Sequence, residues 1–244
     1  MKRLQLDKNA KLTGRVYFKD EVMWLGLSGS GASFTFDGTK LVLKFKGDKI
    51  AVGENPIDYA RIAVYVDGKR VVDEMIDCAE KEVTVIDRTE NAQSVVEIIK
   101  LSESPMSAIS VEAFAEGSAE PLPEKQLKIE FIGDSITCGY GVDDEDENHQ
   151  FTTATEDVTK AYAYKTAKAL DAEYSMFSAS GYGIISGYTE GDEPISEQTI
   201  PQFYCSYGFS RGDFAGTAPQ DIPWDFSKYV PQIIVINLGT NDDS

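Results

Sequence analysis

The residues most able to do chemistry form a short polar block, Gly133-Asp134-Ser135, directly after an apolar run. The run, residues 129–132, is typical of a buried strand. A serine at the turn after such a strand exposes its hydroxyl, and its backbone N–H is free near a helix N-terminus to bind a developing oxyanion. The alternative is that Asp134 or Ser135 only caps a helix. This block alone fits a nucleophile and a simple cap equally well.

Two further polar blocks follow predicted strands in the same way. Another apolar run leads into Gly-Thr-Asn-Asp at 239–242, and the run 172–177 leads into a turn that contains Gly181. The three blocks together resemble the SGNH, or GDSL-type, hydrolase superfamily. That resemblance implies that Ser135 is the nucleophile, and that the N–H of Gly181 and the side-chain amide of Asn241 donate hydrogen bonds to the oxyanion.

Composition disfavours several classes of function. The 244 residues carry a formal net charge of -18. Such a field repels phosphate backbones and anionic lipids, so the chain is predicted to bind neither nucleic acid nor a membrane surface. The three scattered cysteines form neither a disulfide framework nor a metal-ligand spacing. Because no apolar run has the length of a signal peptide core or a membrane span, we expect a cytoplasmic protein; a secreted protein whose signal was removed is the alternative.

The first half of the chain is predicted to be all-β. Short runs of alternating apolar and polar residues recur from about residue 12 to 116, and Asp67-Gly68 has the composition of a tight hairpin turn. Short, regularly spaced strands favour a sandwich or jelly roll. The glycine-dense stretch 25–31 is interpreted as a flexible connection, with a loop that reaches the neighbouring site or a sugar as the alternative.

A change in composition divides the chain. Residues 116–124 contain Gly, Ser and two prolines and are predicted to be a linker. A helix is then expected over 159–170 and a strand over 173–178, which complete a βαβ unit with the strand before Ser135. We therefore predict two domains, a β-sandwich (jelly roll) over 1–120 and an α/β SGNH-hydrolase domain over 121–244. The parallel sheet of the second domain is expected to be incomplete at its C-terminus, because the usual final strand and helix are absent.

Two segments of the second half show no regular period. Residues 187–229 are rich in aromatic side chains, whose faces suit the C–H patches of sugar rings, and Trp224 is the main candidate. The alternative is that these rings cover the edge of the sheet. The acidic run 143–147 lacks the regular spacing of calcium ligands and is predicted to be a solvated loop. We predict no metal and no cofactor.

The order of these features resembles carbohydrate esterase family 2 over almost the whole chain. The stretch 28–36 before the serine block and the stretch 224–231 before the asparagine block carry this likeness. The family pairs a jelly-roll domain with an SGNH domain. The resemblance implies a serine esterase that removes acetyl groups from plant polysaccharides or oligosaccharides through an acyl-enzyme. Trp224 and Asp134 are assigned to the substrate-binding side of the site, and Asp134 and Asp242 are expected to hold turns rather than titrate.

The sequence departs from the family at the general base. The family's catalytic histidine lies C-terminal to Gly-x-Asn-Asp, whereas the sole histidine here is His149, in the acidic loop. His149 does not match the family position, and the sequence therefore has the pattern of the N-terminal portion of a longer enzyme. Two other functions stay open: a carbohydrate-binding protein with an esterase remnant, and an SGNH lipase or thioesterase. No feature of the sequence indicates an oligomeric state.

Overall fold

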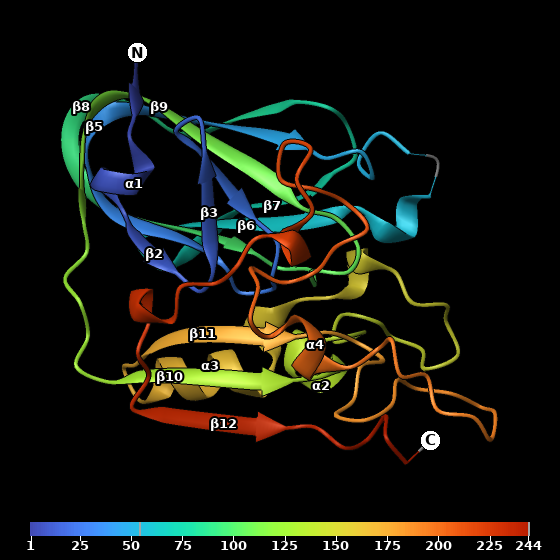
Figure 1. Cartoon of the computed structure of the whole chain (residues 1–244). Helices are drawn as coiled ribbons and strands as arrows, with labels where there is room; N and C mark the ends of the chain where they lie inside the picture. The colour runs from blue at the N-terminus through green and yellow to red at the C-terminus, as the bar shows by residue number, and fades with distance from the viewer. Residues whose placement is uncertain (54, 244) are drawn as a thin grey trace.

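The fold is built from two β-sheets of different size and type. The computed structural model describes residues 1–53 and 55–243. A large antiparallel sheet of nine strands holds most of the first half of the chain, and three parallel strands form a smaller sheet below it in Figure 1. Among the described residues, no helix has the length and apolar character needed to cross a membrane.

The large sheet follows the order β3-β4-β9-β5-β8-β6-β7, with β1 paired to β9 and β2 paired to β5. Its strands are β1 (Lys2–Leu4), β2 (Lys11–Thr13), β3 (Val16–Lys19), β4 (Val22–Leu25), β5 (Gly31–Gly47), β6 (Ala60–Val66), β7 (Lys69–Ile76), β8 (Lys81–Lys100) and β9 (Ile109–Pro121). The predicted hairpin turn between β6 and β7 is confirmed. Asp67 and Gly68 both have positive φ, 50° and 78°, which matches the twist of a two-residue hairpin.

The central strand β5 shows how the sequence pattern builds the core of the large sheet. Every second side chain points inward on each side of an irregularity between Gly38 and Lys40, where the register with both neighbouring strands shifts. Burying one large apolar side chain contributes about 1.5–3 kcal/mol. The fully buried side chains of this strand are Phe34, Phe36, Leu41, Leu43 and Phe45.

The predicted linker 116–124 is wrong over most of its length, because β9 continues to Pro121. Gly117 has a φ of 154° and pairs with Gly38 of β5. A Cβ on Gly38 would lie 2.3 Å from the carbonyl oxygen of Glu116, so the two strands approach at a distance that only glycine allows. Glycine here marks a bend within a strand and not a break in the fold. The division into domains at 120/121 stays a prediction.

The small sheet has the parallel arrangement expected from the sequence. Its central strand β10 (Lys128–Gly133) lies between β11 (Glu173–Ser178) and β12 (Ile233–Asn237). Helix α3 (Tyr162–Ala169) packs on this sheet and is shorter than the predicted 159–170, because Val158–Lys160 forms a separate 3-10 turn. The remaining helices are α1 (Leu6–Asn9), α2 (Ser135–Cys138) and α4 (Ile200–Phe203), with 3-10 turns at Pro56–Asp58, Thr153–Thr155, Pro219–Asp221 and Phe226–Lys228.

β12 differs from the buried strand that the sequence predicts. Val235 packs on the core beneath β10, but Ile234 and Ile236 on the opposite face are 54% and 64% exposed. An apolar run therefore predicted the strand correctly and its burial incorrectly.

The two sheets share part of one apolar core. Ala63, Ile99 and Leu101, from the first half of the chain, pack in one cluster with Ile129 and Phe131 of β10. The long segment after β11, orange to red in Figure 1, runs along both sheets before it enters β12. Because the sheets pack directly, side chains from the first half of the chain can reach the back of the predicted site.

Candidate active site

The parallel sheet brings the three polar blocks to one edge. Gly133, the last residue of β10, pairs with the last residue of each neighbouring strand. Ser135, Gly181 and Asn241 therefore follow the carboxyl ends of three adjacent parallel strands. That edge is where open α/β sheets bind their ligands.

Ser135 is the first residue of α2, and Asp134 caps this short helix. One carboxylate oxygen of Asp134 accepts a hydrogen bond from the N–H of Ile136 at 3.0 Å. Burial raises the pKa of Asp134 above its ordinary value, and hydrogen bonds from backbone N–H groups counteract this rise. Ser135 is partly exposed, whereas Asp134 is only 1% exposed. Asp134 thus holds the turn that presents Ser135, and its burial gives no support for a direct contact with substrate.

Gly181 lies in the turn after β11 with a φ of 78°, a left-handed conformation in which a larger residue is strained. A Cβ built on it would meet no atom within 4 Å, so open space lies beside this backbone. Within the part of the chain that the structure describes, its N–H meets no backbone or side-chain acceptor. A backbone N–H in this position is a candidate donor to an oxyanion.

The block that contains Asn241 and Asp242 holds the turn after Gly181 in place. The side-chain amide of Asn241 donates to the carbonyl oxygen of Tyr182 at 2.9 Å. The carboxylate of Asp242 accepts from the N–H groups of Ile184, Ile185 and Ser186, at 2.9, 2.6 and 3.1 Å. Burial tends to raise the pKa of Asp242, but these three hydrogen bonds outweigh it and hold the pKa below its ordinary value. Asp242 therefore holds a turn, as the sequence analysis expects, and the turn belongs to the glycine block.

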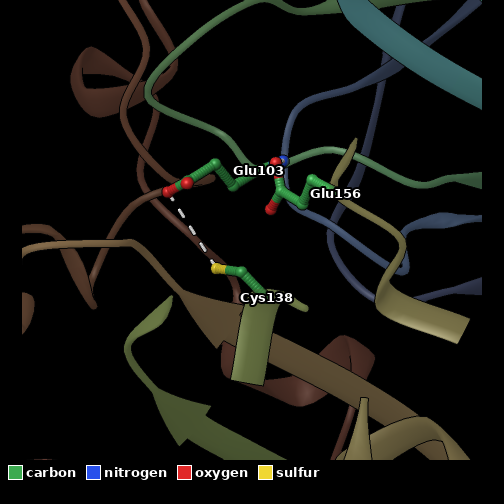
Figure 2. A group of neighbouring side chains, drawn as sticks. All are labelled: Glu103, Cys138 and Glu156. Atoms are coloured by element: carbon green, nitrogen blue, oxygen red, sulfur yellow. Dashed lines mark hydrogen bonds between the residues drawn. The ribbon is translucent and has the colours of Figure 1, made fainter. Parts of the chain in front are cut away.

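A fully buried polar cluster, drawn in Figure 2, contacts the glycine block at Ser180 and includes Cys138 of the helix that begins with Ser135. It contains Glu103, Cys138 and Glu156, whose oxygen and sulfur atoms lie within 4.8 Å of one another. Burial raises the pKa of all three groups above their ordinary values. The amino group of the buried Lys100 donates to the carbonyl oxygens of Ser102 and Glu103 at 2.7 and 3.0 Å, and burial lowers its pKa to about 8. Nothing in the local sequence around these three residues indicated the cluster, because only the fold brings them together.

These side chains also form a candidate metal site among the described residues. Two carboxylates and a thiolate are chemically able to bind a divalent cation. However, the Cys138 thiol already donates to the hydroxyl of Ser178 at 3.2 Å. When protonated, the amino group of Lys100 also supplies a positive charge that would repel a cation. The cluster therefore fits a hydrogen-bonded support for the site better than a metal centre.

His149 lies in the exposed acidic loop. Its Nδ1 is 2.7 Å from a carboxylate oxygen of Asp144, and its side chain is 62% exposed. The loop is only partly solvated as predicted, because Asp143 pairs with Arg61 of β6 at 2.9 Å and with Lys160. The ring is thus held by its own loop.

Trp224 is buried rather than placed on an open sugar-binding surface. It is 8% exposed, and its ring packs edge-on against Tyr207 with centroids 5.1 Å apart. The guanidinium of Arg15 lies 5.2 Å from the Trp224 ring and pairs with Glu130 of β10 at 3.4 Å. The sequence-based assignment of Trp224 to sugar binding is therefore not supported by its burial. Its burial favours the alternative interpretation, in which aromatic rings cover the sheet, and the sugar-binding assignment stays a prediction.

Known proteins resemble the chain in sequence and in structure. A family model described as carbohydrate esterase 2 N-terminal matches residues 12–124. Cellulase/esterase CelE of Acetivibrio thermocellus is 32% identical over 221 residues, which cover 89% of this chain and 24% of that protein. An acetylxylan esterase / glucomannan deacetylase of Cellvibrio japonicus is 29% identical over 98% of this chain and 62% of its own length.

A solved structure extends the likeness across both sheets. The family two carbohydrate esterase from Clostridium thermocellum, in complex with cellohexaose, superimposes with a TM-score of 0.78 and 29% identity. The match covers 96% of this chain and 67% of that one. Of the two relatives compared by sequence, CelE and the Cellvibrio esterase, the chain spans 24% and 62% of the length, less than two thirds in both cases.

Proposed function

Because the chain is homologous to the family 2 carbohydrate esterases over nearly its whole length, we propose that it carries the nucleophile and oxyanion donors of a carbohydrate O-acetylesterase. Its substrates are acetyl esters on plant polysaccharides or their oligosaccharides. The activities named for the Cellvibrio relative, on acetylxylan and glucomannan, support this substrate class.

The proposed reaction is a two-step acyl transfer. The Ser135 hydroxyl loses its proton to a general base, and its oxygen attacks the acetyl carbonyl carbon. The resulting oxyanion accepts hydrogen bonds from the N–H groups of Ser135 and Gly181 and from the Asn241 amide. The sugar oxygen leaves with a proton from the conjugate acid of the base, and water then attacks the acetyl-serine to release acetate.

One observation carries this proposal: three blocks far apart in the sequence are held together at one sheet edge. The pairing of β10 with β11 and β12 aligns their carboxyl ends. The hydrogen bonds of Asn241 and Asp242 to the turn 182–186 then fix the third block against the second. Oxyanion stabilisation depends on donors that are fixed before the charge develops, and these contacts provide such fixation.

The general base in this proposal is not His149. Its ring bonds to Asp144 of its own loop, its side chain is 62% exposed, and no contact with the Ser135 turn is found among the residues that the structure describes. We therefore assign the general base to no described residue of this chain; the relatives are longer than the chain. In the full-length gene product, replacing His149 with alanine should leave turnover unchanged.

The proposal is tested with Ser135→Ala in the full-length gene product. We expect acetate release from acetylated xylan, acetylated glucomannan and an aryl acetate to fall by about 10³-fold or more, with Ser118→Ala, an exposed serine of β9, as the matched control. Near wild-type turnover by Ser135→Ala would refute the nucleophile. Binding of oligosaccharide without turnover by the wild type would favour the binding-protein alternative. Faster hydrolysis of long-chain acyl esters than of acetyl esters would favour a lipase or thioesterase.

A further inference from the structure

The segment that follows β8 passes directly behind the candidate active site. Lys100, Ser102, Glu103 and Ser104 are all 0% exposed, although all four are polar and two of them, Lys100 and Glu103, are ionisable. Side chains of this kind are rarely buried unless they are paired. The segment belongs to the first half of the chain, so the large sheet supplies it to a site whose proposed catalytic residues all follow strands of the small sheet.

Glu103 contacts both the turn that contains Gly181 and the helix α2 that begins with Ser135. Its Oε2 accepts a hydrogen bond from the N–H of Ser180 at 2.7 Å, and Ser180 immediately precedes Gly181. The same oxygen lies 4.0 Å from the Sγ of Cys138, the dashed contact in Figure 2. Cys138 is the last residue of α2, which begins with Ser135. A single carboxylate therefore links the glycine turn to the nucleophile helix.

The backbone of Glu103 is itself held on two sides. Its N–H donates to Oε2 of Glu156 at 3.1 Å, and its carbonyl oxygen accepts from the amino group of Lys100 at 3.0 Å. Cys138 is held from the other side by Ser178. A side chain that is anchored in this way can impose a position on its partners, because packing and hydrogen bonds lock its own conformation.

The charges of the cluster can be balanced by a proton. Glu103, Glu156 and the buried Asp48 all interact electrostatically with the amino group of Lys100, and Oε1 of both Glu103 and Glu156 has no hydrogen-bond partner in the described structure. Like charges this close favour retention of a proton by one carboxyl group. With one proton shared by Glu103 and Glu156, the net charge of these two carboxyl groups and the Lys100 amino group is zero. Glu103 can then keep its bond to Ser180 without a cation.

On the basis of the proposed esterase function, we propose that Glu103 is a positioning residue: it fixes the Ser180–Gly181 peptide against α2, so that the Gly181 N–H and the Ser135 hydroxyl keep the spacing that the oxyanion requires. Glu103 touches no reacting atom. It acts through the Ser180 N–H and the Cys138 thiol.

The test is a series of three substitutions at Glu103 in the full-length gene product. Glu103→Gln keeps the reach and an acceptor oxygen for the Ser180 N–H. Glu103→Asp keeps the acid but shortens the side chain by one methylene, and Glu103→Ala removes both properties. We expect kcat on an aryl acetate to fall about 10–100-fold in the Ala and Asp variants, because a displacement of about 1 Å is sufficient for such a loss. KM should stay near wild type, and the Gln variant should recover most of kcat.

The matched control is Glu130→Gln. Glu130 is a buried glutamate of β10 that bonds Arg15 and Tyr204, in the core between the two sheets. We expect this variant to lower the melting temperature without lowering kcat of the folded fraction. The Glu103 variants are compared after their folded fraction has been measured by circular dichroism, so a loss of fold is not counted as a loss of kcat.

Two outcomes overturn the inference in different ways. If the wild type hydrolyses acetyl esters and Glu103→Asp keeps wild-type kcat, Glu103 is structural only. If Glu103→Gln is as impaired as Glu103→Ala, the charge of Glu103 matters rather than its reach, and the positioning account is wrong. If the wild type hydrolyses no ester, the proposed esterase function itself is wrong. The two outcomes above instead refute only the role of Glu103, so the two kinds of failure are distinguishable.

Discussion

Asn241 depends for its position on a neighbouring loop, and the loop depends on Asn241. Its amide donates to the carbonyl oxygen of Tyr182, the residue after Gly181. The two proposed oxyanion donors are therefore coupled through one hydrogen bond. A donor that is fixed in this way loses little free energy to reorganisation when the oxyanion forms, which is the source of its catalytic effect.

We expect Asn241→Ala to lower kcat by about 10²–10³-fold and to change KM little, because an oxyanion donor acts chiefly in the transition state. Steady-state kinetics of the full-length gene product on an aryl acetate measure both constants. The neighbouring exposed Thr240→Ala is the control. A rise in KM at constant kcat would instead make Asn241 a residue that binds the ground-state substrate.

Trp224→Ala should destabilise the fold without selecting between substrates. Replacing a buried tryptophan with alanine typically costs about 3–5 kcal/mol, and the ring here packs against Tyr207 and beside the Arg15 guanidinium. Urea unfolding measures the stability, and the rates on acetylated oligosaccharide and aryl acetate should fall together with the folded fraction. A selective loss on the oligosaccharide, at unchanged stability, would restore the sugar-binding assignment.

At the level of single residues, the sequence predicted the positions of those residues that a local pattern marks. A glycine-containing polar block after an apolar run locates Ser135, Gly181 and Asn241 at one edge of a parallel sheet. The burial of Trp224 could not be predicted, because its ring packs in a cluster with Trp24 and Ala108, which lie far from it in the sequence. Glu103 could not be found either, since a glutamate between two serines is normally a surface residue and only the packing of the two sheets buries it.

The turn between β11 and α4 is the element that the C-terminal block controls. Three consecutive N–H groups at 184–186 point to the carboxylate of Asp242, and hydrogen bonds to a charged acceptor contribute about 1.5–3 kcal/mol each. Close approach also requires Gly183, since a Cβ there would lie 2.6 Å from a carboxylate oxygen of Asp242. The turn is therefore built around one anion.

Asp242→Asn should destabilise the chain in a pH-dependent way. The folded pKa of Asp242 is lower than its ordinary 3.8, so its contribution to stability is present above that value and is lost as the pH falls through the folded pKa. The difference in unfolding free energy between wild type and variant should be about 1.5–3 kcal/mol at pH 7 and should shrink below pH 3.8. Urea titrations at several pH values measure it, with the exposed Asp243→Asn as control. A difference that stays constant down to pH 2 would contradict this account.

The elements themselves were partly predictable. Alternation of apolar and polar residues gave the inward face of β5, and the Asp67-Gly68 pair gave the hairpin. The segment around Gly117 was wrongly predicted to be a linker. A glycine that permits the close approach of two strands gives that segment the same local composition as a linker. Burial of β12 was also misjudged, since an apolar run indicates a strand but not which of its faces the rest of the fold covers.

At the scale of the whole molecule, the two sheets depend on each other. The first half of the chain supplies Lys100, at the end of β8, and Glu103, in the segment after β8, next to the candidate site, and it supplies Arg15, between β2 and β3, to the aromatic core beside β10. The small sheet supplies the edge on which the proposed chemistry takes place. We therefore expect neither sheet to keep its local geometry when expressed without the other.

The outer face of β12 is an exposed apolar surface of the small sheet. Parallel strands normally have both faces covered, yet Ile234 and Ile236 project from an edge strand and are 54% and 64% exposed. An exposed apolar edge strand promotes association. In the 244-residue chain, the double substitution Ile234→Thr and Ile236→Thr should therefore reduce aggregation, because threonine keeps the strand propensity and removes apolar surface.

The stability of the isolated chain should change by no more than about 0.5 kcal/mol in the double variant, since both side chains are largely exposed. The matched control is Val235→Thr on the inner face. Val235 is partly buried against the core that includes β10, and placing a hydroxyl there should cost about 1 kcal/mol. Light scattering against concentration measures association, and urea unfolding measures stability. Equal association of wild type and double variant would show that this face is not what drives self-association, whereas a large loss of stability in the double variant would show that it is covered in solution.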